Sequence, residues 1–465
     1  MKYRIEKDAL GEMSIEEDKY YGINTKRALG NFALGAKSVN LALVHEIALI
    51  KKAAAKVNLT LKSLSSDIAG AIIKASEEVI EGKFDDEFTV SALQGGAGTS
   101  TNMNVNEVIA NRAIELLGGK KGDYSLVHPL NHVNMCQSTN DVYPTAVRIA
   151  SIRLLRKLSS SLAELQEELQ RKENEFSDII KLGRTELMDA LPMLAGQGFG
   201  AYAQAIARDR WRVYKVEERL RQINIGGTAI GTGMNAPIKY IFMITDELQA
   251  LTGLGLARAE FPMDITQNTD VFVEVSGLLK ACAVNLMKIS NDLRLLASGP
   301  RGGLSELSLP EVQAGSSIMP GKVNPVICEM VAQVSMKVIS NDYAITLASS
   351  SGQLELNAFL PLIAESLLES LELLTDTCNI FREKCIQGIE VNKEACIENI
   401  ENSTVLATAL TNHIGYDKAA YIAKKVLKEN KTVKQIVLEE NILSKEEVDK
   451  ILNIYEITKP GIPGK

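Results

Sequence analysis

The sequence predicts a mainly α-helical protein built on a central bundle of long helices. Three observations carry this prediction: long apolar stripes with helical spacing, breaks rich in Gly, Ser and Pro between them, and shorter mixed segments at both ends. In the first long stretch, apolar residues recur at spacings of three and four: Ile152, Leu155, Leu158, Leu162, Leu165 and Leu169. This pattern places one apolar stripe on a helix of more than about twenty residues.

Comparable helical patterns follow along the middle of the chain, at residues 201–223, 271–297, 329–347 and 362–386. Together these segments indicate a bundle of long helices. Stripes this wide would leave apolar surface uncovered in a single chain, so we expect association with identical subunits.

The character of the sequence changes twice, which predicts three domains. Residues 1–138 mix short apolar segments with Gly-rich turns and are expected to form an N-terminal mixed α/β domain. Residues 139–395 hold the central bundle, and residues 396–465 form a small helical C-terminal domain. The run Ser444 to Glu447 has the pattern of a capping box and should open a short helix there.

Composition excludes several classes of function. The 465 residues carry 58 acidic and 51 basic side chains, a net charge of −7, and no Lys/Arg-rich stretch that suggests a nucleic-acid partner. The first residues lack an apolar leader and no apolar run approaches the roughly 18 residues of a membrane span, so we expect a cytoplasmic protein without membrane contact.

Cysteine and histidine usage argues against a disulfide framework and a built-in metal centre. The six cysteines lie far apart without a CxxC pair, and we expect reduced, mostly buried thiols. The nearest histidines, His128 and His132, are separated by Pro129, which disfavours a shared helical face for paired metal ligands. No metal ligands are therefore predicted.

The segment of residues 315–325 carries the strongest chemical signal. It has two glycines and two prolines, and it places Ser316, Ser317, Lys322 and Asn324 between two helical stretches. Such a loop can turn backbone amides inward as an anion-binding nest, beside hydroxyls, an ammonium and a carboxamide. It suits a carboxylate that gains charge in a reaction, although on its own it also fits a flexible connection.

This segment resembles the signature loop of the aspartase, fumarase and argininosuccinate lyase superfamily, and the resemblance extends over essentially the whole chain. It implies a homotetramer with a helical core and active sites assembled from three subunits. It also implies that Ser316 is the catalytic base, with Lys322 as the candidate that stabilises its alkoxide. No organic cofactor is implied. Some relatives respond to a divalent cation, for which the sequence offers no ligand cluster.

Three further segments match the family's other active-site regions. The resemblance implies that Thr99 binds substrate, that Ser138, Thr139 and Asn140 hold one carboxylate, and that Thr185 holds the other. Read alone, each segment is more typical of a helix cap or a turn. Their joint presence in family order is what favours a binding site.

The resemblance favours the aspartase branch, and thus elimination of ammonia from L-aspartate to give fumarate. Ser316 would take a proton from Cβ to form an aci-carboxylate intermediate, which Ser317, Lys322 and Asn324 would stabilise. Glu186 stands where relatives carry His or Gln, and we hypothesise that it faces the substrate's ammonium or is held by Lys322. The alternative is a glutamate turned to solvent.

Several departures from the family pattern leave other functions open. Met188, Gly198, Ala332 and Cys328 each differ from the usual residue, which allows a substituted aspartate or another amine as substrate. The alternatives are a fumarate hydratase, a lyase acting on another succinyl-type amino acid, and a non-catalytic paralogue. A nucleotide-binding module is disfavoured, because the glycines at 95–98 lack the GK[ST] pattern. Arg301 is expected to pair with a carboxylate and hold the loop.

Overall fold

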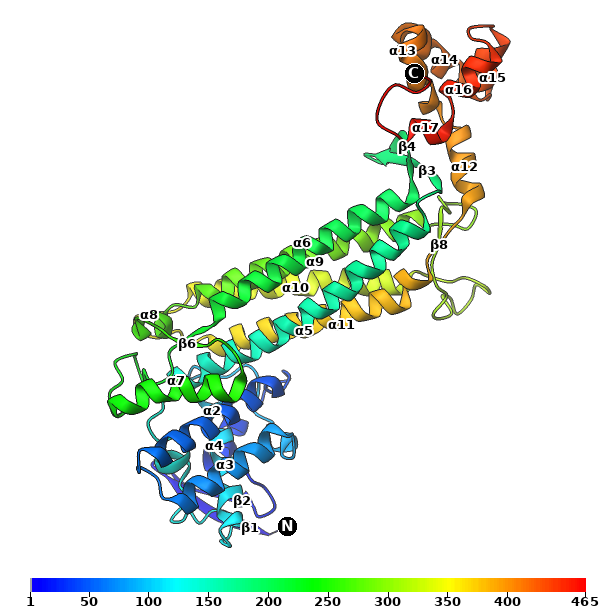
Figure 1. Cartoon of the computed structure of the whole chain (residues 1–465). Coiled ribbons are helices and arrows are strands. Elements are labelled where there is room, and N and C mark those ends of the chain that lie inside the picture. Colours follow the sequence, from blue (N-terminus) through cyan, green and yellow to red (C-terminus); the bar gives the residue numbers. More distant parts are fainter. Residues whose placement is uncertain (1) are drawn as a thin grey trace. The chain divides into compact units, whose positions relative to one another are not determined.

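A computed structural model describes residues 2–465 and confirms the mainly helical class. Its long helices correspond to the predicted ones (Figure 1), and their ends differ by at most six residues except at the start of the first one, which begins well before the predicted stripe at Ile152. The long helices are α5 (Thr139–Glu175), α6 (Ala195–Leu220), α9 (Asp270–Leu296), α10 (Val326–Ser350) and α11 (Leu360–Lys384).

The chain forms two compact units, and each long helix contributes a stretch to both. The first unit comprises Met1–Ser159, Trp211–Ala281 and Met336–Leu374. The second unit comprises Ser160–Arg210, Cys282–Ser335 and Thr375–Lys465. The predicted boundaries of three domains, at residues 138 and 395, stay a prediction.

The first unit adds short helices and two small sheets to its part of the bundle. The antiparallel hairpin of β1 (Tyr3–Asp8) and β2 (Gly11–Glu16) opens the chain, and β5 (Gln222–Ile223) pairs in parallel with β6 (Ala257–Arg258). Helices α2, α3 and α4 pack together around buried aliphatic residues. The helices outside the bundle are α1 (Ile23–Asn31), α2 (Leu41–Thr60), α3 (Ser66–Ile80), η1 (Asp85–Glu87), α4 (Thr99–Leu116), η2 (Pro129–Val133), α7 (Ile238–Thr252) and α8 (Pro262–Gln267).

The second unit adds the hairpin of β3 (Ile180–Thr185) and β4 (Met188–Leu194), and β7 (Leu307–Ser308) pairs with β8 (Glu390–Val391). Its short helices pack Leu410, Ile422 and Ile436 against Ile180 of β3. Ser444 and Glu447 form the predicted capping box at the start of α16. The short helices are η3 (Ile386–Gly388), α12 (Lys393–Glu401), η4 (Thr404–Leu406), α13 (Ala407–Ile414), α14 (Tyr416–Glu429), α15 (Val433–Glu439), α16 (Lys445–Ile451) and α17 (Ile454–Ile457).

Helix α5 begins before Pro144, although a proline usually ends or kinks a helix. Pro144 has no N–H to donate to the carbonyl of Asn140, four residues earlier. The side chain of Asn224 donates to that carbonyl instead, at 3.0 Å. The helix therefore continues through the proline with its backbone oxygen satisfied.

The cysteines are free, and all are buried except Cys136, which is half-buried. The thiols of Cys328 and Cys385 lie 3.6 Å apart in the second unit. Across residues 2–465, no helix combines the length and apolar character needed to cross a membrane.

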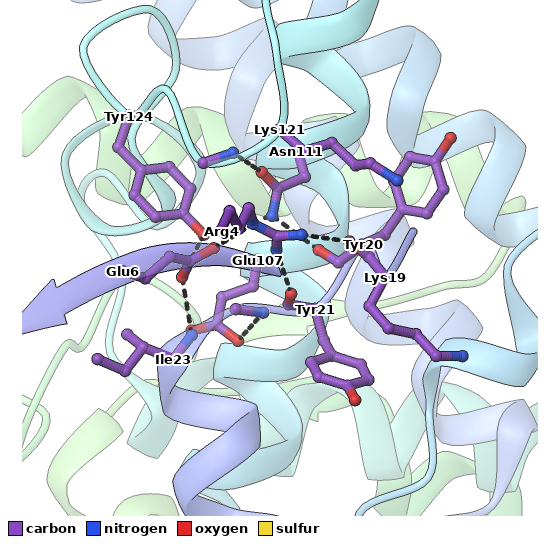
Figure 2. A network of polar contacts seen from close by, with 12 residues as sticks. Arg4, Glu6, Lys19, Tyr20, Tyr21, Ile23, Glu107, Asn111, Lys121 and Tyr124 are labelled. Atoms are coloured by element: carbon purple, nitrogen blue, oxygen red, sulfur yellow. Dashed lines mark hydrogen bonds and ion pairs between the residues drawn. The ribbon is translucent and has the colours of Figure 1, made fainter. Parts of the chain in front are cut away.

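A polar network anchors the N-terminal hairpin to α1 and α4 (Figure 2). Arg4 donates to the carbonyls of Glu16, Lys19 and Tyr21 at 3.0, 2.8 and 2.7 Å. The carboxylate of Glu107, buried on α4, accepts the backbone N–H of Gly22 at 2.8 Å. It accepts four further bonds from the next turn, from the N–H and side-chain groups of residues 24 and 25. The start of α1 is thus fixed by a carboxylate rather than by a cap of its own.

This network leaves no room for a side chain at Gly22. A Cβ there would lie 2.6 Å from Glu6 Oε2, 2.6 Å from the Tyr124 hydroxyl and 2.9 Å from Glu107 Cδ. We expect Gly22→Ala to lower the free energy of unfolding by about 1 to 3 kcal/mol, because these partners are held by several bonds each. Thermal unfolding followed by circular dichroism measures the effect.

Gly30→Ala is the matched control on the same helix, because a Cβ at Gly30 meets nothing within 4 Å. This variant should unfold at or slightly above the wild-type temperature, since alanine favours a helix. Equal midpoints for the two variants would contradict the steric argument.

Candidate active site

Thr99 is the first residue of α4, directly after a tight turn. Gly98 has a φ of +96°, and a Cβ there would lie 2.3 Å from the ring of Tyr143, so glycine is required on both counts. The Thr99 hydroxyl is exposed and donates to the carbonyl of Gly96 at 2.8 Å. Its oxygen remains able to accept a hydrogen bond, and the side chain is accessible to a ligand.

The run Ser138, Thr139 and Asn140 forms the start of α5. The Ser138 N–H donates to Asp141 Oδ1 at 2.9 Å, and the Asn140 N–H donates to the Ser138 hydroxyl at 3.3 Å. Asn140 also donates from its side chain to the carbonyl of Ala229 at 2.8 Å. The run therefore does form a helix start, and among residues 2–465 no acceptor receives the hydroxyl hydrogens of Ser138 and Thr139.

Asn102 brings the beginnings of α4 and α5 together. Its side-chain amide donates to the Thr139 hydroxyl at 3.1 Å, and it lies one turn after Thr99 on α4. The first unit thus gathers Thr99 and the run 138–140 around two adjoining helix N-termini. Free backbone N–H groups and the helix dipole at such positions favour an anion.

Thr185 and Glu186 lie at the tip of the hairpin of β3 and β4 in the second unit. Thr185 pairs with Met188, so Glu186 and Leu187 alone make the turn, with φ values of +54° and +67°. A two-residue hairpin loop in which both residues have positive φ is typical of a type I′ turn. Neither Glu186 nor Leu187 is the Gly or Asn that usually occupies such a turn. All of these side chains are exposed. Within residues 2–465, Glu186 makes no ion pair with Lys322.

The segment 315–325 forms an irregular loop between β7 and α10, closed at its base. The Gly315 N–H donates to the carbonyl of Lys322 at 2.8 Å, and the Asn324 amide donates to the carbonyl of Gly315 at 2.8 Å. A Cβ on Gly315 would lie 2.6 Å from the Lys322 carbonyl oxygen, so the closure requires glycine. The Lys322 ammonium is exposed and pairs with no other described residue.

The Ser316 hydroxyl oxygen accepts the backbone N–H groups of Ile318 and Met319, at 3.2 and 2.9 Å. Donors aimed at this oxygen stabilise negative charge on it, as an alkoxide requires. The predicted nest is therefore centred on the Ser316 oxygen itself. No contact between Lys322 and Ser316 is present among the described residues.

A buried carboxylate, Glu306, ties this loop region to the hairpin. It lies 2.7 Å from Arg184 and 3.2 Å from Lys181, and it accepts from Asn399 of α12 at 3.1 Å. The expectation that Arg301 holds the loop through a carboxylate is wrong, because Arg301 is exposed and pairs with no described residue. Arg184, beside Thr185, makes this contact instead.

The predicted site residues fall into two sets, one in each unit. Thr99, Ser138, Thr139 and Asn140 belong to the first unit, whereas Thr185, Glu186 and the loop with Ser316, Ser317, Lys322 and Asn324 belong to the second. Sequence reasoning missed the buried Lys51 and Asp141 beneath the run 138–140. Asp141 directly follows the run 138–140, which resembles the family's carboxylate-binding region. For Lys51, the available signal of burial was its position after an apolar stretch of the sequence. Across the described residues, no group of three or more His, Cys, Asp or Glu could hold a metal ion.

Comparison with known proteins identifies the family. A family model described as "Lyase" matches residues 11–340, and one described as "Fumarase C C-terminus" matches residues 406–459. The chain therefore belongs to the lyase family that contains the aspartases and fumarases.

Relatives within this family are named aspartate ammonia-lyase. The protein of that name from Bacillus subtilis is 47% identical over 464 residues, covering 100% of this chain and 98% of its own. The protein of the same name from Escherichia coli K12 is 44% identical, and the match covers 99% of this chain and 97% of the Escherichia coli protein.

Solved structures share the whole fold. A fumarate lyase:delta crystallin from Brucella melitensis, bound to cobalt, is 46% identical with a TM-score of 0.95, covering 99% of this chain and 100% of that one. A class II fumarase from Schistosoma mansoni is 37% identical with a TM-score of 0.94, and the match covers 99% of this chain and 100% of the fumarase chain.

The Glu306 contacts predict a stability effect. Glu306→Gln leaves Lys181 and Arg184, both largely buried, without a countercharge, which should cost about 3 kcal/mol. The thermal midpoint of the variant should fall well below that of Glu311→Gln, an exposed control in the following loop. Equal midpoints would show that the two cations find other partners.

Proposed function

We propose that this protein is a carbon-nitrogen lyase that eliminates ammonia from L-aspartate to give fumarate. The observation that carries the proposal is the Ser316 loop, whose backbone N–H groups converge on a serine oxygen in a chain resembling aspartate ammonia-lyases. A base in an anion-stabilising nest suits removal of a proton next to a carboxylate.

Ser316, as alkoxide, takes the proton from Cβ of L-aspartate. The electron pair moves into the adjacent carboxylate and forms a doubly charged aci-carboxylate, and ammonia then leaves from Cα. Ser317, Lys322 and Asn324 stabilise the added charge, with the Lys322 ammonium as the charged donor. The protein's side chains supply every group this route requires.

The remaining residues hold the substrate in the reactive geometry. Ser138, Thr139 and Asn140 bind one carboxylate at the N-terminus of α5, Thr99 contributes from α4, and Thr185 binds the other carboxylate from the hairpin tip. These donors are neutral, so the direct contacts to the two carboxylates place no unpaired buried cation against the substrate.

Glu186 favours an amine over an alcohol as leaving group. Its exposed carboxylate follows Thr185 in a turn that fixes its backbone direction. A carboxylate beside a dianion is repulsive unless it faces a positive group, and the ammonium of aspartate supplies that group while malate does not.

The protein is proposed to act as a homotetramer with active sites shared between subunits. Support comes from large apolar side chains left exposed on long helices. On α6, Trp211 and Tyr214 are 63% and 71% exposed, and on α10, Met336 and Tyr343 are 56% and 65% exposed. Light scattering should give about four times the 50.7 kDa of one chain. The cytoplasmic location stays a prediction.

Ultraviolet absorbance of fumarate tests the reaction, with L-aspartate and L-malate assayed in parallel. We expect fumarate from aspartate, and a loss of at least roughly a thousandfold in Ser316→Ala, because the base is removed. Ser308→Ala, which alters a hydroxyl outside the loop, is the control. Fumarate from malate alone would make the protein a fumarate hydratase.

The role of Glu186 is tested by the same assay. Glu186→Gln removes the carboxylate without changing its size, so kcat/KM for aspartate should fall roughly tenfold while any turnover of malate rises. Glu311→Gln serves as the control for an exposed carboxylate. An unchanged preference for aspartate over malate would show that Glu186 faces solvent.

A further inference from the structure

A lysine lies fully buried beneath the predicted carboxylate-binding run. Lys51, in the middle of α2, has an exposed fraction of 0%. Its ammonium donates to Asn134 Oδ1 at 2.8 Å and to Gln137 Oε1 at 2.9 Å. Gln137 immediately precedes Ser138. Lys51 therefore holds the chain directly before the residues that would bind a substrate carboxylate.

The contacts of Lys51 extend to both helices of the first residue set. Asn134 Oδ1 also accepts the side-chain amides of Asn102 and Asn106 from α4, at 3.3 and 3.2 Å. Asn102 in turn donates to the Thr139 hydroxyl at 3.1 Å. Three hydrogen bonds, through Asn134 and Asn102, thus link the ammonium to the Thr139 hydroxyl.

A buried carboxylate holds the same run from its other side. Asp141 has an exposed fraction of 0% and accepts the N–H groups of Ser138, Gly226 and Thr228 at 2.9, 3.1 and 2.9 Å. Lys51 and Asp141 share no hydrogen bond, yet they are close enough for each charge to stabilise the other. Two opposite buried charges, one bonded to Gln137 and one to the Ser138 N–H, therefore hold the beginning of the run 138–140.

Burial makes this pair sensitive to neutral pH. Desolvation lowers the pKa of Lys51 to about 7, opposed by the charge of Asp141. Desolvation likewise raises the pKa of Asp141 to about 7, opposed by its backbone donors and by Lys51. The other titratable groups that face Asp141 are Cys136 and Tyr240 of α7, whose own pKa values are raised by burial.

The remaining charged side chains of α2 have partners elsewhere. Glu46 pairs with Arg153, Lys52 with Glu77 and Lys56 with Glu247. Among the titratable groups of η2, His128 and His132 use their Nδ1 atoms to accept backbone N–H groups, so each ring carries its proton on Nε2 when neutral. The elements packed around Lys51 therefore leave Asp141 as its electrostatic partner.

We propose that Lys51 is a positioning residue that supplies, through Gln137 and Asn134, the positive charge needed when the run 138–140 binds a substrate carboxylate. This inference rests on the proposed function for the identity of the ligand, a dicarboxylate. The direct donors to the carboxylate are neutral, so a negative charge brought to this buried place needs a compensating cation. Lys51 is the buried ammonium in contact with that segment.

A consequence distinguishes this role from simple packing. A bound carboxylate raises the pKa of both Lys51 and Asp141, because a nearby negative charge favours their protonated forms. Binding of a dianion therefore takes up protons when the pH is near or above 7. By linkage, the Kd of the dianion rises with pH in this window, by up to tenfold per pH unit for each proton taken up.

Isothermal titration calorimetry with succinate, an unreactive dicarboxylate, tests this on the wild-type protein. The titration is done at pH 7.5 in two buffers that differ in ionisation enthalpy, where succinate is already a dianion. We expect a buffer-dependent heat that corresponds to net proton uptake. A heat that does not depend on the buffer would overturn the inference.

Lys51→Met identifies the source of the protons, because methionine keeps the length of the side chain but has no charge. Its succinate Kd should rise at least roughly tenfold at pH 7, and the proton uptake should vanish, since Asp141 without its cation stays protonated. Lys52→Met is the control on the adjacent residue and should match the wild type. If Lys51→Met does not fold, Lys51→Gln replaces it.

The outcomes separate this inference from the proposed function. Fumarate production from aspartate together with unchanged proton uptake in the Lys51 variant would overturn the role of Lys51 alone. Proton-linked succinate binding without turnover of aspartate would support it and overturn the proposed function. Absence of succinate binding to the wild type would overturn the role of Lys51, while fumarate production from aspartate would still decide the proposed function.

Discussion

Buried carboxylates, each held by several hydrogen-bond or ion-pair partners, fix loops and element starts in both units. Asp141, Glu107 and Glu306 have exposed fractions of 0, 1 and 0%. Asp141 fixes the start of α5, Glu107 fixes the start of α1, and Glu306 joins the hairpin of β3 and β4 to the region before the loop at 315–325. A buried carboxylate without such partners would cost several kcal/mol. Each carboxylate therefore fixes the conformation of the segment around it, because only that conformation supplies the partners that the buried charge requires.

This constraint explains why the binding residues lie at element ends rather than within them. At the start of α5, Asp141 accepts the N–H of Ser138 and the Ser138 hydroxyl oxygen accepts the N–H of Asn140, which leaves the hydroxyl hydrogens of Ser138 and Thr139 available to a ligand. Donors fixed in this way need no reorganisation when charge develops, which is the main source of electrostatic catalysis. Fold stability and site geometry rest on the same contacts here, so substitutions beneath the site alter both.

The sequence predicted the long helices well, because their apolar stripes repeat with the helical period over many turns. It did not predict that α5 passes through Pro144, since the compensating donor, Asn224, is 84 residues away in the chain. The site residues came from motif resemblance, and their local geometry is consistent with the proposed roles. Lys51 was missed because a Lys51-Lys52 pair in a helix reads as surface, and tertiary contacts alone distinguish the buried member.

The two sets of site residues differ in how firmly the surrounding residues hold them. The first set adjoins two buried groups: Lys51, which donates to Asn134 and Gln137, and Asp141, which accepts three backbone N–H groups. The Ser316 loop is exposed and is closed only at its base, through Gly315, Lys322 and Asn324. The Lys322 ammonium pairs with no other described residue, so the closure at the base is what holds this loop. Under the proposed function, the buried contacts beneath the first set keep its donors fixed, whereas the exposed loop can adapt to the bound dianion.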